Sequence, residues 1–206
     1  MKNIVLAFLL CVFTMGISAQ QHSSLEAIGE FSDSLIALKK ADKWGFADMK
    51  NNLVINFRSD ITSEQYYRME KTKAPIFKEG LCLIQTYKKG IPYYGFIDKT
   101  GKVSIEPVFL NATNFFGDYA LAILVEKQVK GKNEYLNKDI ISYTFYEAII
   151  DRKGTVIKVL RDMPHILMSK EKYKKPFSTS HFVSPTQIAV ETVKNEWQLV
   201  SIDQNQ

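Results

Sequence analysis

Carboxylates at a fixed spacing are the first residues of this chain that could support chemistry. Asp48, Asp98 and Asp151 recur at intervals of about fifty residues, as expected of an internal repeat. A calcium loop needs several oxygen ligands at alternate positions, which the sequence DKTG after Ile97 lacks. Asp at the first position of a turn and Gly or Asn at the fourth favour a tight turn instead. We predict structural turns with the residues Asp48, Asn51, Asp98, Gly101, Asp151 and Gly154.

The remaining reactive side chains form no recognisable catalytic motif. His22, His165 and His181 lack metal-ligand spacing, and the chain contains no HExxH, GxSxG or phosphate-binding glycine loop. Cys82 lies in the apolar run LCLI, where a buried and unreactive thiol is the usual case. We therefore predict no catalytic residue, no metal site and no cofactor. The alternative is a hydrolase or enzyme accessory with a pocket around Glu147, His165 and His181.

The turns must be positioned by β-hairpins. The sequence YGFIDKTGKVSIEP, starting at Tyr94, places short aromatic or β-branched runs on both sides of its turn. Val103 and Ile105 alternate with polar residues, which predicts a strand with one buried face. WGFADMKNNLVINF from Trp44 and EAIIDRKGTVIKVL from Glu147 follow the same pattern.

A related strand precedes each hairpin. FSDSLIAL from Phe31, FKEGLCLI from Phe77 and FFGDYALA from Phe115 align without gaps, although a start at Phe116 fits the third copy almost as well. We predict three repeat units, at 31–76, 77–114 and 115–160, between an N-terminal segment at 20–30 and a C-terminal region at 161–206. No unit could bury its apolar face alone.

The combined pattern resembles the WG (or KWG) repeat of bacterial, often exported, proteins. Lys43-Trp44-Gly45-Phe46 and Tyr94-Gly95-Phe96-Ile97-Asp98 carry the resemblance best. In the third unit Glu147-Ala148 replace the aromatic residue and glycine, so the local backbone there is expected to differ. The resemblance implies an all-β, mainly antiparallel fold of tandem hairpins, with an interaction or structural role and no reaction.

The aromatic residues of the repeat have two interpretations. Trp44, Phe46, Tyr94 and Phe96 could present a stacking surface for a carbohydrate or a peptide. Packing is the favoured interpretation, because large aromatic side chains dominate core burial and the adjacent glycines permit close backbone approach.

Three segments depart from the repeat. Residues 60–71 have helical composition and predict a short helix. The polar insertion at 126–143 predicts a long hairpin tip or mobile loop, with a binding role open for Lys130, Lys132, Tyr135 and Lys138. Near the C-terminus, QIAVETVKNEWQLVSI predicts two strands that cap the array.

The N-terminus predicts export. A single charge at Lys2, an apolar run and small residues up to Ala19 are typical of a signal peptide at 1–19, cleaved after Ala19. A retained membrane helix is the alternative, although the run is short for a bilayer span. No later apolar run approaches that length. The net charge of +5 is modest and lacks a wide basic face, so nucleic acid is not an expected partner.

These observations favour an exported, non-enzymatic repeat protein in the periplasm, on the cell surface or in the medium. Its partner would be a protein or a cell-envelope polymer. A purely structural envelope component without a discrete ligand is a further alternative.

Overall fold

The fold is entirely β in the part of the chain that the computed structural model describes, residues 25–68, 74–193 and 196–202. All strand pairs are antiparallel, so the prediction of an all-β hairpin meander is confirmed. The predicted signal peptide and His22 lie outside the described residues. None of the described segments forms an apolar helix of bilayer-spanning length. The strands are β1 (Ala27–Ser32), β2 (Leu35–Lys40), β3 (Lys43–Ala47), β4 (Leu53–Arg58), β5 (Leu81–Lys88), β6 (Ile91–Asp98), β7 (Val103–Phe109), β8 (Asn111–Ala112), β9 (Ala120–Asn133), β10 (Lys138–Ile150), β11 (Val156–Asp162), β12 (His181–Ser184), β13 (Gln187–Val193) and β14 (Glu196–Ser201).

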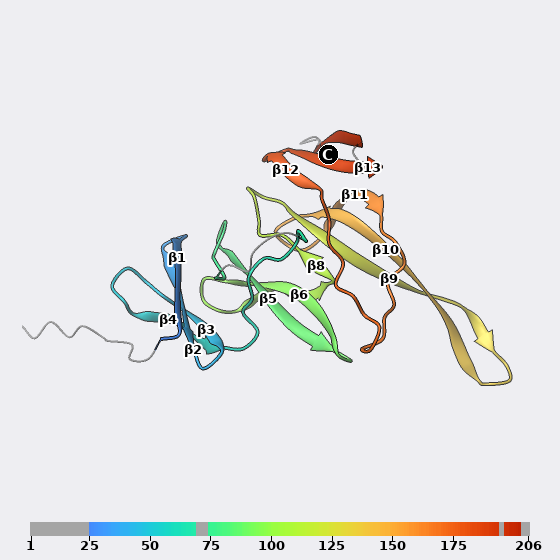
Figure 1. The fold of residues 1–206 in the computed structure, drawn as a ribbon, viewed down its shortest axis with the longest axis horizontal. Helices are drawn as coiled ribbons and strands as arrows, with labels where there is room; N and C mark the ends of the chain where they lie inside the picture. Colours follow the sequence, from blue (N-terminus) through green and yellow to red (C-terminus); the bar gives the residue numbers. More distant parts are fainter. Residues whose placement is uncertain (1–24, 69–73, 194–195, 203–206) are drawn as a thin grey trace, which may run out of the picture.

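The strands form four sheets that follow one another along the chain (Figure 1). Sheet 1 contains β1 to β4, sheet 2 β5 to β7, sheet 3 β8 to β11 and sheet 4 β12 to β14. Within each sheet, strands that are consecutive in sequence pair with one another. The folding unit is therefore a local meander, as the hairpin signals predict.

All four sheets share one pairing register between two consecutive strands, which are β2 and β3, β5 and β6, β9 and β10, and β13 and β14. The register pairs Ile36 with Ala47, Cys82 with Ile97, Ala120 with Ile150, and Ile188 with Val200. Three residues before the second member of each pair lies the WG aromatic position. It holds Trp44, Tyr94, Glu147 and Trp197 in sheets 1 to 4. Sheet 4 thus repeats the geometry of the first three units, although its sequence WQLVS retains only the tryptophan.

The aspartate turns are built alike in the first three sheets. In sheet 2, Asp98 Oδ1 accepts hydrogen bonds from the amides of Thr100 at 2.8 Å and Lys102 at 3.1 Å. Asp48 and Asp151 accept the same pair of amide bonds in their own turns. The fourth turn residues have positive φ angles, 63° at Asn51, 83° at Gly101 and 80° at Gly154, in the region that favours Asn and Gly.

The glycine after the WG aromatic residue permits a bulge in the neighbouring strand. Between Tyr94 and Phe96 the pairing of β6 with β7 shifts, so Gly95 lies against extra backbone of β7. A Cβ at Gly95 would lie 2.4 Å from the carbonyl oxygen of Ile105. In sheet 3, Ala148 pairs directly with Val159, and the register shift lies between Glu147 and Ala148, whereas Gly45 and Gly95 are left out of the pairing. This is the local difference in the backbone that the missing glycine predicts.

Consecutive sheets pack face to face, so sheets 2 and 3 each bury one face against the sheet before and the other against the sheet after. Cys82, Ile84 and Ile97 of sheet 2 pack with Phe46 and Ile55 of sheet 1. The opposite face, with Leu83 and Phe96, packs with Phe115, Ala120 and Ala122 at the start of sheet 3. Leu121, Ile123 and Ile149 of sheet 3 pack in turn with Ile188 and Val190 of sheet 4. The core is therefore a series of junctions between consecutive sheets.

The short helix predicted at 60–71 is wrong for the residues that the structure describes. Residues 60–62 run alongside β5 instead, where the Thr62 amide donates to the Leu83 carbonyl at 3.1 Å and Gln85 donates to Asp60. Tyr66 then turns into the core and is fully buried. Residues 69–71 lie outside the described part of the chain.

The insertion at 126–143 forms the outer halves of β9 and β10. The strands pair out to Asn133 and Lys138, and Figure 1 shows this hairpin extending beyond the other sheets. We refer to residues 126–143 as the hairpin arm. The predicted C-terminal strands are β13 and β14, and β12 joins them in sheet 4. Their predicted turn includes Lys194 and Asn195, which lie outside the described residues.

Candidate functional site

A groove of about 690 Å³ lies where the connection between β11 and β12 passes sheet 4. Its volume is in the range of ligand sites. The connection contributes Met163 to Ile166 and Lys175 to Thr179, and β14 contributes Trp197. Tyr67 and Arg68, from the segment predicted as a helix, complete one wall together with Arg161 and Glu191.

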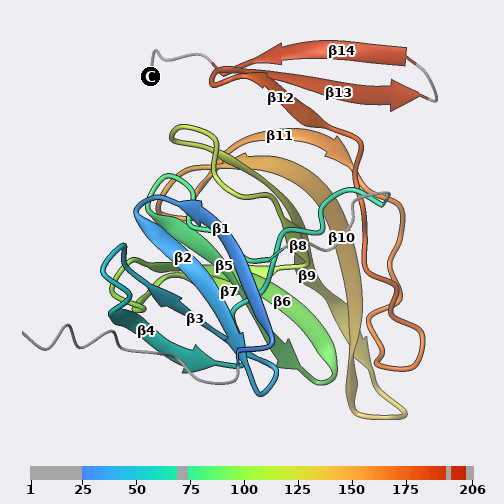
Figure 2. The same cartoon turned by 60° about the vertical axis from the view of Figure 1, so that its left-hand side comes forward.

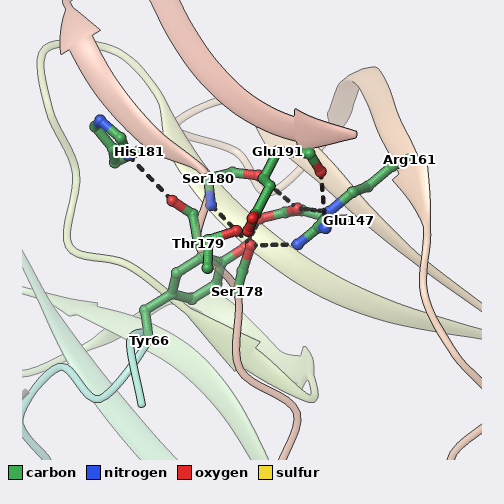
Figure 3. A network of polar contacts seen from close by, with 8 residues as sticks. All are labelled: Tyr66, Glu147, Arg161, Ser178, Thr179, Ser180, His181 and Glu191. Atoms are coloured by element: carbon green, nitrogen blue, oxygen red, sulfur yellow. Dashed lines mark hydrogen bonds and ion pairs between the residues drawn. The ribbon is translucent and has the colours of Figure 1, made fainter. Parts of the chain in front are cut away.

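The buried carboxylate of Glu147 connects several segments next to the groove through hydrogen bonds (Figure 3). Glu147, at the WG aromatic position of sheet 3, is fully buried. Its carboxylate accepts hydrogen bonds from the Tyr66 hydroxyl at 2.5 Å, Arg161 Nε at 2.7 Å and the Ser180 hydroxyl at 2.9 Å. Burial, and then the neighbouring Glu147 carboxylate, raise the pKa of Tyr66, so the phenol stays a neutral donor. The buried charge is thus paired and hydrogen-bonded, which is the condition for tolerating it.

Arg161 links three parts of the chain. Besides Glu147, its guanidinium donates to the Glu191 carbonyl at 3.1 Å and to the Ser178 hydroxyl at 2.8 Å. The planar fork of an arginine suits such simultaneous contacts. Sheet 3, β13 and the connection before β12 are therefore fixed to one another at the base of the groove.

Two cations meet one aromatic ring in the groove. Arg68 Cζ lies 5.5 Å and Lys175 Nζ 5.8 Å from the centroid of Phe177. Lys175 Nζ also lies 4.6 Å from the Tyr94 ring, and it donates to Gln65 Oε1 at 3.5 Å. Burial lowers the pKa of Lys175 to about 8. A partly desolvated ammonium that contacts aromatic rings and, among the described residues, has no ion-pair partner can bind an anion.

The structure does not bring Glu147, His165 and His181 together. The His165 ring packs edge-on against Phe145, with centroids 5.6 Å apart. His181 packs against Trp197 and contacts the Thr179 carbonyl at 3.0 Å through Nδ1. Figure 3 shows His181 turned away from the Glu147 carboxylate, whose three contacts are all to other residues. These three residues therefore form no acid–base constellation.

No metal site is evident in the described ranges, where no group of at least three His, Cys, Asp or Glu side chains could hold an ion. Cys82 is buried between sheets 1 and 2, and its burial raises the pKa of the thiol. A thiol of this kind is unreactive.

The repeat aromatic residues lie in the junctions, while the residues of the hairpin arm are exposed. Phe46, Tyr94 and Phe96 are buried and Trp44 is half-buried. Lys130 and Lys132 lie on β9, Lys138 begins β10, and Tyr135 is fully exposed in the turn between them. Lys130 Nζ donates to Gln128 Oε1 within the arm. The arm and the groove are thus two separate groups of cationic and aromatic residues.

Residues 94–123 match the family model of the WG containing repeat. The chain therefore contains a WG repeat. The match starts at Tyr94 in β6 and ends at Ile123 in β9, so it includes the junction between sheets 2 and 3. No curated protein and no solved structure matches the chain.

Sequence reasoning identified Glu147 as a departure from the WG pattern and missed its partners. Tyr66, Arg161, Ser178 and Ser180 come from separate segments with no motif between them. The charged replacement of an aromatic residue in a repeat was the one usable signal, because a buried acid requires donors nearby.

Proposed function

We propose that this WG-repeat protein is an exported, non-catalytic binding protein whose groove takes an acidic segment of a protein partner. The observation that carries the proposal is the pair Arg68 and Lys175 on the ring of Phe177. Both cations line a groove that also contains Met163, Ile166 and Trp197. A peptide with carboxylates beside apolar side chains satisfies both parts of this lining.

A protein segment fits this lining better than a cell-envelope polymer. An anionic polysaccharide would use the cations but would leave the apolar wall without a matching group. Arg161 hydrogen-bonds both to Ser178 in the connection at 163–179 and to Glu191 in β13. These bonds favour a groove that is already formed before a partner binds, which lowers the entropic cost of binding. Export rests on the N-terminal residues up to Ala19.

The test is crosslinked affinity capture of the tagged protein from its native envelope. We expect R68Q/K175Q to lose a protein partner that the wild-type chain captures. The matched control is K130Q/K132Q in the hairpin arm, which removes two positive charges elsewhere and should capture that partner normally. If R68Q/K175Q folds normally and captures the same partner, the groove is not the site. If the wild-type chain captures a polysaccharide and no protein, the proposed partner class is wrong and the partner is a cell-envelope polymer.

Export has its own measurement. N-terminal sequencing of the protein recovered from cells should begin at Gln20. A chain that retains Met1 or Lys2 in the cytoplasmic fraction would contradict export.

A further inference from the structure

Two of the three junctions between sheets use one contact pattern. In both, a Phe at the start of the following unit packs on the residue two positions after the WG aromatic residue. Phe77 packs edge-on against Phe46 with ring centroids 4.7 Å apart, and Phe115 packs in the same way against Phe96 at 4.9 Å. Ile149, the equivalent of Phe96 in sheet 3, is buried against sheet 4. Each junction thus joins the forward face of one sheet to the backward face of the next.

The forward face of sheet 4 lies at one end of the array (Figure 2). By register, Leu199 is the equivalent of Phe46, Phe96 and Ile149. Those three residues are 0–1% exposed, whereas Leu199 is 56% exposed and the neighbouring Trp197 is 51% exposed. This face has the junction residues but no following sheet in the described chain.

The backward face of sheet 1, at the opposite end of the series of sheets, is also exposed. Phe31 pairs with Ile36 and therefore occupies the position that Phe77 and Phe115 hold in the next two units. Phe77 and Phe115 are fully buried, whereas Phe31 is 53% exposed and Ile28 is 64% exposed. The described residues of sheet 1 thus present a junction Phe with no preceding sheet to receive it.

We propose that copies of this chain associate head to tail, with sheet 1 of one copy packed on sheet 4 of the next. Phe31 would contact Leu199 as Phe77 contacts Phe46 within the chain. A second copy is the favoured occupant because both halves of a contact that is used at two internal junctions are exposed on the same molecule. Such an interface is heterologous, so copies form a chain or a closed ring. The proposal goes beyond the proposed function and does not depend on the groove.

Complementation between two blocked variants tests the proposal. Sedimentation of the mature protein should show mass that increases with concentration. F31D disrupts the contact surface on sheet 1 (the head), and L199D disrupts the contact surface on sheet 4 (the tail). Each variant alone should therefore remain monomeric. An equimolar mixture should form a dimer and no larger species, because one intact head and one intact tail remain. I140D, at an exposed position of the hairpin arm, should assemble like the wild-type chain.

Several outcomes would overturn the proposal. A wild-type protein that stays monomeric at all concentrations has no such interface. If F31D still dimerises while L199D does not, the contact is a two-fold one between copies of sheet 4. Thermal melts of F31D and L199D check that both variants are folded, because substitutions at exposed positions should leave the fold intact. Trp197 borders both the groove and the forward face of sheet 4, but Leu199 does not line the groove, so loss of assembly in L199D is distinguishable from loss of partner capture in R68Q/K175Q.

Discussion

Phe115 packs edge-on against Phe96 across the junction between sheets 2 and 3, with ring centroids 4.9 Å apart. Both side chains are fully buried. F115A should lower the free energy of unfolding by about 3–5 kcal/mol, because it leaves a cavity in the junction. F31A is a matched control, since it changes the same repeat position where the ring is exposed. It should change the free energy of unfolding by no more than about 0.5 kcal/mol. Urea unfolding of dilute protein measures both, and equal losses would mean that the junction is not a main source of stability.

The close approach at Gly95 predicts a steric effect. A Cβ there would lie 2.4 Å from the Ile105 carbonyl oxygen and 2.7 Å from the Pro107 nitrogen, both backbone atoms. G95A should therefore destabilise the protein by about 1–3 kcal/mol. G131A, where a Cβ meets nothing within 4 Å, should leave the melting temperature nearly unchanged. A G95A protein that melts like G131A would show that the β7 bulge can shift at little cost.

The buried pair Glu147–Arg161 predicts strong coupling. E147A leaves the arginine without its carboxylate and should cost about 3–5 kcal/mol. R161M leaves a buried carboxylate whose remaining donors in the described part of the chain are the Tyr66 and Ser180 hydroxyls. The double variant E147A/R161M should lose clearly less than the sum of the two single variants, by about 0.5–3 kcal/mol. Additive losses in denaturant unfolding would show that the two side chains act independently.

The lowered pKa of Lys175 predicts a pH dependence of binding. The groups that face its ammonium are the rings of Tyr94 and Phe177 and the Gln65 amide oxygen. Burial raises the pKa of Tyr94, so the phenol stays neutral while Lys175 loses its proton. Affinity for an acidic peptide should be highest below pH 8 and should fall as the pH rises through about 8, because only the charged amine attracts the carboxylate.

Two variants separate this effect from others. K175R remains charged well above pH 8, so its affinity should stay flat across that window, and K175Q should bind weakly at every pH. Calorimetry with a Glu- and Leu-rich peptide, and a Gln-for-Glu version as control, measures this. Folding stability should rise between pH 8 and 10.5, because the unfolded chain binds the proton more tightly there. An unchanged wild-type affinity from pH 7 to 9 would exclude Lys175 from the site.

Local signals in the sequence were sufficient to predict the hairpins. The Asp-to-Gly turns and the alternating strands depend on residues within a few positions of one another, and the structure shows all three turns. The helix at 60–71 failed because long-range contacts override composition. Ile61 bridges Ile84, and the Tyr66 carbonyl accepts from the Ser178 amide. Of the two alternatives for the polar insertion at 126–143, the structure shows the long hairpin, whose halves pair as strands out to Asn133 and Lys138.

The sequence predicted β13 and β14 of sheet 4, but not their equivalence to the repeat units, and it did not predict the groove. Sheet 4 lacks the Gly and the Asp of the repeat, so its relationship to the other units is visible only in its pairing register. The groove draws on Arg68, Arg161, Lys175 and Trp197, which are far apart in the chain. The tertiary fold brings these residues together from β11, β14 and two connecting segments.

The segment that matches the WG repeat, residues 94–123, contains both Phe96 and Phe115. The sequence unit is therefore a junction, composed of the second half of one sheet and the first strand of the next. A gene duplication of that length would insert a sheet that already carries a forward face and a backward face suited to its neighbours. An array of such units is extended one layer at a time, because each layer contacts only its neighbours.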